Sequence, residues 1–384
     1  MARRSRLFSL TALARAYQRN LKALAKATRP PRAAKVASGL RGLLPASAAA
    51  ASPGRAARPV RGARPAAKRT PASGEWVAGL ARGPAGARRY HLYIPPGLAL
   101  QRGEKLPLMV MLHGCGQTGR DLAAVSRMNR IAARHRFLVL YPEQERMANA
   151  HGCWNWFERR SGKADAEAAT LLAAVDQVAS THAVDLARVA VAGLSAGASM
   201  AVLMAARYPA RFCAVAMHSG VAPGTAESSA HAMAAMHGRR DAHLPLPAEP
   251  MAQAAAVSAL PVPPLPTLPP LLVLHGDADG VVSVHNAAAT ALLWAEALGA
   301  RPGALRTLQR GQRHAMRVTE FKARGHTVVA LREVVGLAHA WSGGAARRPY
   351  SDPAGPDASA LIWAFVARQL VHQKTKKTGP GACW

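Results

Sequence analysis

The sequence predicts an α/β sandwich whose central sheet is mainly parallel. Short aliphatic runs with the character of strands, such as residues 108–112 and 137–141, alternate with longer helical segments such as 164–182. Continuous apolar runs of this kind are typical of parallel strands that are covered on both faces. The repeated alternation therefore favours helices packed on both sides of one sheet.

Each expected element follows from its local pattern. Prolines end the first and third strands, and the segment 225–270, which is rich in Ala, Met and Pro, interrupts the alternation. We expect this segment to be an insertion or a lid. Strands are expected at residues 90–94, 108–112, 137–141, 189–192, 212–217, 271–274 and 327–335, and helices at 122–135, 164–182, 283–298 and 357–371, with one more that ends at Tyr208.

Composition excludes several classes of protein. Half of the residues are apolar, which is ample for a core, while only 5% are aromatic and 18% are charged. This balance excludes a coiled coil, a collagen and a wholly disordered chain. No run approaches 18 apolar residues, so a membrane-spanning helix is not expected. Four cysteines are too few for a disulfide scaffold.

The net charge of +30 is unevenly distributed. Residues 1–74 contain 17 Lys or Arg and no Asp or Glu. Within this arm, leucines recur on one face of a possible basic amphipathic helix at 5–27, which would suit an anionic surface; a solvated tail is the alternative. Residues 28–74 have the composition of a disordered linker. We expect a folded domain at 75–373 and a basic tail at 374–384.

A pentapeptide of the form Gly-x-Ser-x-Gly is the strongest chemical signal. Residues 193–197, GLSAG, follow the apolar run 189–192 and precede an Ala-rich helical segment. This strand–turn–helix setting is that of a nucleophile elbow, in which glycines leave room for a sharp turn and the helix N-terminus favours negative charge. The alternative is a tight turn with a capping serine. The setting favours Ser195 as a nucleophile.

Such a serine needs a histidine base and a carboxylate that orients it, in the chain order Ser, Asp or Glu, His. Asp277 and Asp279 both follow the expected strand 271–274, and the position in the turn favours Asp279, with Asp277 shaping the turn. His339 follows the last expected strand, and we expect it to be the base. The later histidines that remain are expected to be ordinary surface residues, two of them in a charged loop before that strand (His314 and His326) and two elsewhere (His285 and His372).

An acyl-transfer site also needs two N–H donors for the developing oxyanion. The candidates are the N–H of Ala196, directly after the serine, and that of Cys115, in the loop after the expected strand 108–112. Cys153 could approach Cys115. A bridge between them and two buried free thiols both stay open.

Five segments, read together, resemble the esterase family that includes poly(3-hydroxybutyrate) depolymerases. The resemblance covers about residues 88–370 and implies an α/β-hydrolase fold with serine esterase chemistry and with neither a metal nor a cofactor. The segments are LMVMLHGCGQT (108–118), LVLYPEQ with HGCWNWF (within 138–157), VAVAGLSAGASM (189–200), LHGDADGVV (274–282) and GLAHAWSGG (336–344), reinforced by YSDPAGPDAS (350–359).

The resemblance also implies roles for single residues. Ser195, Asp279 and His339 coincide with the family's catalytic triad, and Cys115 with its oxyanion loop. The tryptophans of the aromatic block, Trp154 and Trp156, either shape the acyl site or pack in the core.

The implied reaction is hydrolysis of polyhydroxyalkanoate or related short-acyl esters, polymeric substrates included. Acetyl and feruloyl esters of polysaccharides are the alternative within the family. Relatives are often secreted, but no convincing secretory signal precedes the domain. Extracellular, cytoplasmic and granule-associated locations therefore stay open. One departure from many relatives is small: Ala198 stands where they have a second glycine.

A protein that binds nucleic acid through its basic arm is a remote alternative. The arm has the charge for it, but Phe8 and Tyr17 are its only aromatic residues and no nucleic-acid-binding motif is present. We therefore expect an ester as the partner, a granule or other anionic surface as a further partner of residues 1–74, and no specific nucleic acid.

Overall fold

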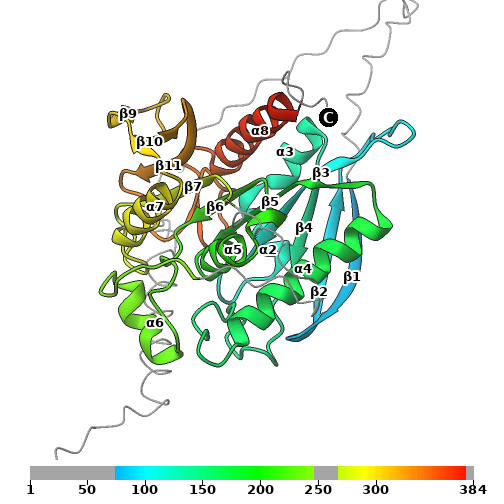
Figure 1. Ribbon diagram of the computed structural model, residues 1–384, viewed down its shortest axis with the longest axis horizontal. Coiled ribbons are helices and arrows are strands. Elements are labelled where there is room, and N and C mark those ends of the chain that lie inside the picture. The colour runs from blue at the N-terminus through cyan, green and yellow to red at the C-terminus, as the bar shows by residue number, and fades with distance from the viewer. Residues whose placement is uncertain (1–73, 246–266, 378–384) are drawn as a thin grey trace, which may run out of the picture.

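The computed structural model describes residues 74–245 and 267–377. These residues form a sheet of 11 strands covered by helices on both faces, with a separate two-stranded ribbon (Figure 1). This is the mainly parallel α/β sandwich that the sequence predicts. The helix expected at 5–27, the linker at 28–73 and residues 246–266 of the expected insertion lie outside the described residues.

Six strands at the centre of the sheet run parallel, and antiparallel strands flank them on both sides. The order is β1-β2-β4-β3-β5-β6-β7-β11-β10-β8, with β9 paired to β10. The parallel block runs from β4 to β11. The strands are β1 Glu75–Gly83, β2 Gly86–Ile94, β3 Leu106–Leu112, β4 Leu138–Pro142, β5 Val184–Leu194, β6 Ala214–His218, β7 Leu271–Gly276, β8 Arg301–Pro302, β9 Arg306–Leu308, β10 Met316–Ala323 and β11 His326–Val334; β12 Trp341–Ser342 and β13 Ser351–Asp352 form the ribbon.

The helices divide between two apolar cores, one on each face of the sheet. One core contains residues of α4 Lys163–Thr181, α5 Ala196–Arg207 and α7 His285–Ala297. The other contains residues of α2 Gly119–Ser126, α3 Met128–His135 and α8 Ala358–Lys377. α6 Ser229–Met236 lies in the segment expected as an insertion.

Strand β3 shows why the apolar runs predict the sheet correctly. All seven of its residues are buried. Leu108 and Val110 pack in one core while Met109 and Met111 pack in the other, because successive side chains of a strand point to opposite faces. A continuous apolar run is therefore what a strand covered on both faces requires.

The structure corrects the expected loop before the last strand. His314 and His326 were expected in one charged loop, but β10 lies between them and pairs antiparallel with β11. β10 carries Arg317, Glu320 and Lys322 among its apolar residues, and this polar face hides the strand pattern. His326 is the first residue of β11, and His314 contacts Asp352 at 3.1 Å.

Differences at the two ends of the described chain are smaller. β1 was not expected, and it pairs with β2 along its whole length. The last helix, α8, continues to Lys377 and so enters the segment expected as a basic tail. Within the described residues, no helix is both long and apolar enough to cross a membrane.

The parallel block brings three chain segments to one edge of the sheet. β5 ends at Leu194, β7 at Gly276 and β11 at Val334. Because the carboxyl ends of parallel strands meet at the same edge, the residues that follow these strands lie together. Those residues include Ser195, Asp279 and His339.

Candidate active site

Ser195 occupies a sharp turn between β5 and α5. Its φ of 56° and ψ of −121° lie in a strained region for a residue with a side chain. Its N–H donates to the carbonyl of His218 at 2.9 Å. A Cβ at Gly193 would lie 2.3 Å from the backbone of Gly197, and one at Gly197 would lie 2.2 Å from the carbonyl oxygen of Leu112. Both glycines of the pentapeptide are thus required by close backbone packing.

Asp279 and His339 contact each other at the same edge of the sheet as this turn. His339 Nδ1 lies 2.7 Å from Asp279 Oδ2, and the Asp279 side chain is fully buried. The other carboxylate oxygen accepts the N–H groups of Val281 and Val282, each at 2.9 Å. Burial alone would raise the pKa of the Asp279 carboxyl, but hydrogen bonds with His275 and His339 hold this pKa well below its usual value.

A second histidine supports the same carboxylate. His275 Nε2 lies 2.9 Å from the carbonyl oxygen of Val282 and 3.4 Å from Asp279 Oδ2. Because a carbonyl can only accept, Nε2 carries the proton. His275 is fully buried, and its N–H is shared between the carbonyl and the carboxylate. The side chain therefore helps to hold Asp279 in place.

Asp277, the other carboxylate considered as the partner of the histidine base, binds different residues. Its Oδ1 accepts the N–H of Gly336 at 2.7 Å, and its Oδ2 lies 3.1 Å from Arg317. These contacts fix the turn after β11. The structure thus brings His339 to Asp279, while the Asp277 side chain, expected to shape its own turn, binds the turn after β11 instead.

His218 links the serine turn to the histidine loop. Its carbonyl accepts the N–H of Ser195, its Nε2 accepts the N–H of Ser342 at 3.1 Å, and its ring stacks on Trp341 with centroids 5.0 Å apart. Among the described residues, no hydrogen bond joins Ser195 Oγ to His339. Contacts of this kind often tighten only when a substrate binds.

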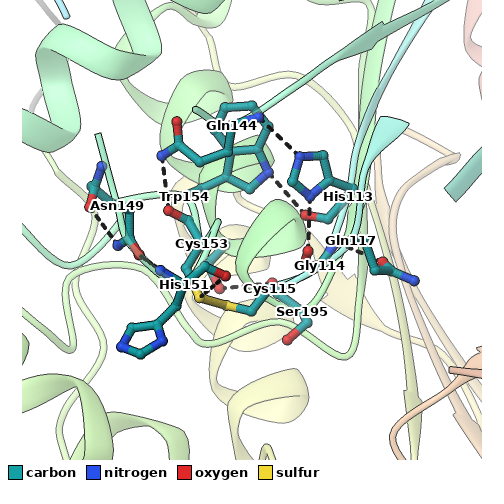
Figure 2. Close-up of a disulfide and its surroundings, with 12 residues drawn as sticks. His113, Gly114, Cys115, Gln117, Gln144, Asn149, His151, Cys153, Trp154 and Ser195 are labelled. Atoms are coloured by element: carbon teal, nitrogen blue, oxygen red, sulfur yellow. Dashed lines mark hydrogen bonds between the residues drawn. A yellow bond between two sulfur atoms is a disulfide. The ribbon is translucent and has the colours of Figure 1, made fainter. Parts of the chain in front are cut away.

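The loop after β3 lies against Ser195 (Figure 2). A Cβ at Gly114 would lie 3.6 Å from the Cβ of Ser195. The N–H of Gly114 donates to Gln117 Oε1 at 2.9 Å, which closes the loop upon itself. Cys115 in this loop is joined to Cys153 by a disulfide, so the structure decides between the bridge and the two free thiols.

A buried ion pair holds the loop that carries Cys153. Glu167 lies 3.1 Å from Arg88, and the two side chains are 0% and 4% exposed. Gln144 donates to Glu167 at 2.6 Å and to the carbonyl of Cys153 at 2.9 Å. Asn155 donates to both carboxylate oxygens through its backbone and side-chain nitrogens. These contacts fix the segment that carries Cys153, the disulfide partner of Cys115.

The two tryptophans of the aromatic block are both buried. Trp154 is 0% exposed, and its Nε1 donates to the carbonyl of His113 at 2.9 Å. Trp154 is therefore tied by this hydrogen bond to the start of the loop that carries Cys115. Trp156 is 8% exposed and meets Phe157 edge to face. Contact of either ring with a substrate stays a prediction.

The sequence analysis missed five polar residues that shape the site. Three are histidines that directly follow, or end, an apolar strand, and this position could have identified them. The other two are polar side chains inside otherwise unremarkable segments. The five are His113, His218, His275, Gln144 and Glu167. Within the described part of the chain, no group of three or more His, Cys, Asp or Glu is arranged to hold a metal ion.

Comparison with known proteins identifies a family for the chain. Residues 88–302 match the family model described as esterase PHB depolymerase. The chain belongs to this esterase family. The matched segment contains Ser195, Cys115 and Asp279, while His339 lies beyond its end.

Individual members of the esterase family resemble parts of the chain. Poly(3-hydroxyalkanoate) depolymerase C of Paucimonas lemoignei is 38% identical over 129 residues, which are 33% of this chain and 30% of the relative. Probable acetylxylan esterase A of Aspergillus clavatus is 28% identical over 227 residues, 59% of this chain and 71% of the relative. Feruloyl esterase B of Neurospora crassa is 34% identical, and the match spans 44% of its length. The match thus spans less than half of two of these three relatives.

A solved structure shares the fold. The acetyl xylan esterase from Aspergillus awamori aligns with a TM-score of 0.53 at 21% sequence identity, over 70% of this chain and 94% of its own. At this identity the likeness concerns the fold alone, which is that of the α/β-hydrolases.

Two buried neutral histidines make stability depend on pH. Burial lowers the pKa of His113 to about 4, and burial followed by the charges of His275 and His339 lowers that of His218 to about 3. The unfolded chain, with a histidine pKa near 6.5, binds more protons than the folded one between these values. Above pH 6.5 these two histidines therefore do not reduce the free energy of unfolding, and this free energy falls as the pH drops toward 4. Between pH 7 and pH 5 we expect a loss on the order of 4 kcal/mol in urea unfolding.

The variant His218→Gln should remove about half of this pH dependence, since Gln still offers an acceptor to Ser342. His285→Gln is the matched control because His285 is exposed. Equal slopes for both variants and the parent would contradict the assignment.

The shared proton of His275 leads to a second prediction. His275→Leu removes the donor to Asp279, whereas His275→Gln keeps an N–H near the same place. Hydrogen bonds to charged groups contribute about 1.5–3 kcal/mol, so kcat of the Leu variant should fall roughly tenfold to a hundredfold with a smaller change in KM. The Gln variant should recover most of it. If both variants lose stability alike while kcat of the folded protein is unchanged, His275 does not position Asp279.

Proposed function

We propose that the chain hydrolyses carboxylic esters with Ser195 as the nucleophile, His339 as the base and Asp279 as the orienting acid. The observation that carries the proposal is the 2.7 Å contact between His339 and Asp279 at the same sheet edge as the strained Ser195 turn. Membership of the esterase family supports it. A nucleophile, a base and an acid held by separate strands at one sheet edge are what acyl transfer requires.

The protonation states follow from the contacts. Asp279 is ionised because its pKa is held well below the usual value, so it accepts only and His339 Nδ1 carries the proton. His339 Nε2 is then left with a lone pair and can take the proton of the Ser195 hydroxyl. When the imidazolium forms, the Asp279 carboxylate stabilises it.

The reaction then follows two steps. Ser195 Oγ attacks the ester carbonyl, and the N–H groups of Ala196 and Cys115 bind the oxyanion. His339 gives its proton to the leaving alcohol, and an acyl-enzyme remains. Water, deprotonated by the same histidine, releases the acid and restores Ser195. The disulfide at Cys115 and the tight start of α5 at Ala196 support both donors in their places.

For the substrate we propose poly(3-hydroxybutyrate) or related short-acyl esters. The 38% identity to a poly(3-hydroxyalkanoate) depolymerase supports this choice. The basic segment 1–74, with its 17 Lys or Arg, is proposed to attach the enzyme to a granule or other anionic surface. Hydrolysis of acetyl or feruloyl esters of polysaccharides is the second candidate, because the acetylxylan esterase match covers 71% of that relative.

Substitution tests the three roles. Ser195→Ala should lower kcat on a p-nitrophenyl acyl ester by about 10⁶-fold, because a triad works as a unit. Asp279→Asn should lower it by about 10⁴-fold through the wrong histidine tautomer. Asp277→Asn is the matched control, since Asp277 binds Gly336 and Arg317, and should change kcat by less than tenfold. Circular dichroism checks that each variant is folded. Activity that survives in Ser195→Ala would refute the mechanism.

A panel of substrates tests the specificity. We expect faster hydrolysis of soluble 3-hydroxybutyrate oligomers than of acetylated or feruloylated xylan. If residues 1–74 attach the enzyme to an anionic surface, hydrolysis of granules should fall steeply with salt while hydrolysis of oligomers does not. A higher rate on xylan esters would favour the second candidate, and granule hydrolysis insensitive to salt would remove the attachment role.

A further inference from the structure

A cavity lies at the end of the sheet opposite Ser195. It has a volume of about 180 Å³, and its lining residues come from the end of β10, the turn that joins β10 to β11, the start of β11, and residues 368–372 of α8. His326 at its wall is the first residue of β11, whereas the segment with His339 follows Val334 at the other end. Nine residues of strand separate these ends by roughly 30 Å. The cavity is therefore separate from the proposed esterase site.

Every ionisable side chain that lines this cavity is basic. Lys322 comes from β10, His326 from β11, and Arg368 and His372 from α8, while no Asp or Glu is among the lining residues. The nearby carboxylate of Glu320 is already bound by Arg306 at 3.0 Å. The cavity thus gathers positive charge that no acidic side chain in its lining balances.

Arg332, a buried arginine on β11, is affected by the positive charge of Arg368. Arg332 is 8% exposed, and its Nε has no hydrogen-bond partner within the part of the chain that the structure describes. Burial and, next, the charge of Arg368 lower the pKa of Arg332. Arg332 itself does not line the cavity. Neighbouring like charges cost free energy, and an anion bound between Lys322 and Arg368, which do line it, would offset that cost.

The basic groups are held on a fixed frame. Gln369, which is buried, donates to the carbonyl of Thr327 at 3.1 Å and so ties α8 to β11 inside the cavity. The rings of His326 and His372 lie with their centroids 4.0 Å apart across the same junction. The junction of α8 and β11 is thus fixed before a ligand arrives, so binding need not order the backbone that carries Lys322 and Arg368.

We propose that this cavity binds a phosphate group. The fork of a guanidinium matches two phosphate oxygens, and a lysine supplies a point charge beside it, which are the roles that Arg368 and Lys322 can take. The volume is smaller than the roughly 300 Å³ at which pockets for drug-sized ligands begin. A tetrahedral oxyanion fits this size, whether it is free phosphate or the head of a phospholipid.

Calorimetry of the full chain at constant ionic strength tests the proposal with inorganic phosphate and pyrophosphate as probes. We expect Arg368→Ala and Lys322→Ala each to weaken binding by on the order of tenfold, since each removes a charged donor. Arg324→Ala is the matched control, because Arg324 lies in the same turn but does not line the cavity. Both Lys322 and Arg368 are exposed, so their removal leaves the core intact.

The result that overturns the proposal is equal binding by Arg368→Ala and Arg324→Ala, since these two variants have the same net charge and differ only in whether the lost arginine lines the cavity. Flotation with phosphatidylcholine vesicles, with and without phosphatidic acid, then distinguishes the sources. If Arg368→Ala, unlike Arg324→Ala, loses vesicle binding, the phosphate belongs to a lipid. If vesicle binding is equal while phosphate binding differs, the ligand is soluble.

Discussion

The geometry around Ser195 depends on the hydrogen bonds that the buried carboxylate of Glu167 accepts. A charge removed from water is costly unless its partners satisfy it, and here Arg88, Gln144 and Asn155 together supply four donors. Two of these partners belong to the chain that leads into and out of Cys153. The helix that carries Glu167 thereby fixes a loop that has almost no regular structure of its own.

A second buried carboxylate, that of Asp279, likewise has its acceptor positions filled. Asp279 accepts two backbone N–H groups on one oxygen and faces His339 and His275 on the other. Each carboxylate has its acceptor positions filled by groups from different segments, so neither can rotate without losing several bonds. The loops at the sheet edge are therefore ordered by buried charge, while the strands beneath them are ordered by apolar packing.

Sequence patterns predict the apolar packing of the strands better than the hydrogen bonds of the buried carboxylates. Apolar runs identify β3 and β7, and the position of Asp279 in its turn, two residues past Asp277, anticipates the contact with His339. The partners of Glu167 could not be anticipated, because Glu167 is one of three acids in an Ala-rich helix and has the pattern of any surface residue. β10 was missed because it lies in the antiparallel flank of the sheet, where a strand needs only one apolar face. Bridging of two cysteines depends on how two distant loops approach.

The disulfide between Cys115 and Cys153 makes the site sensitive to the redox state of its surroundings. It closes a loop of 38 residues, which corresponds to about 4 kcal/mol of lost freedom in the unfolded chain. One of its two cysteines supplies the N–H proposed to meet the developing charge of the substrate. In a thiol-rich compartment this link would open while β3 and β4 remain paired through their backbones. The sheet would persist, but the placement of the Cys115 N–H would then depend on the local redox potential.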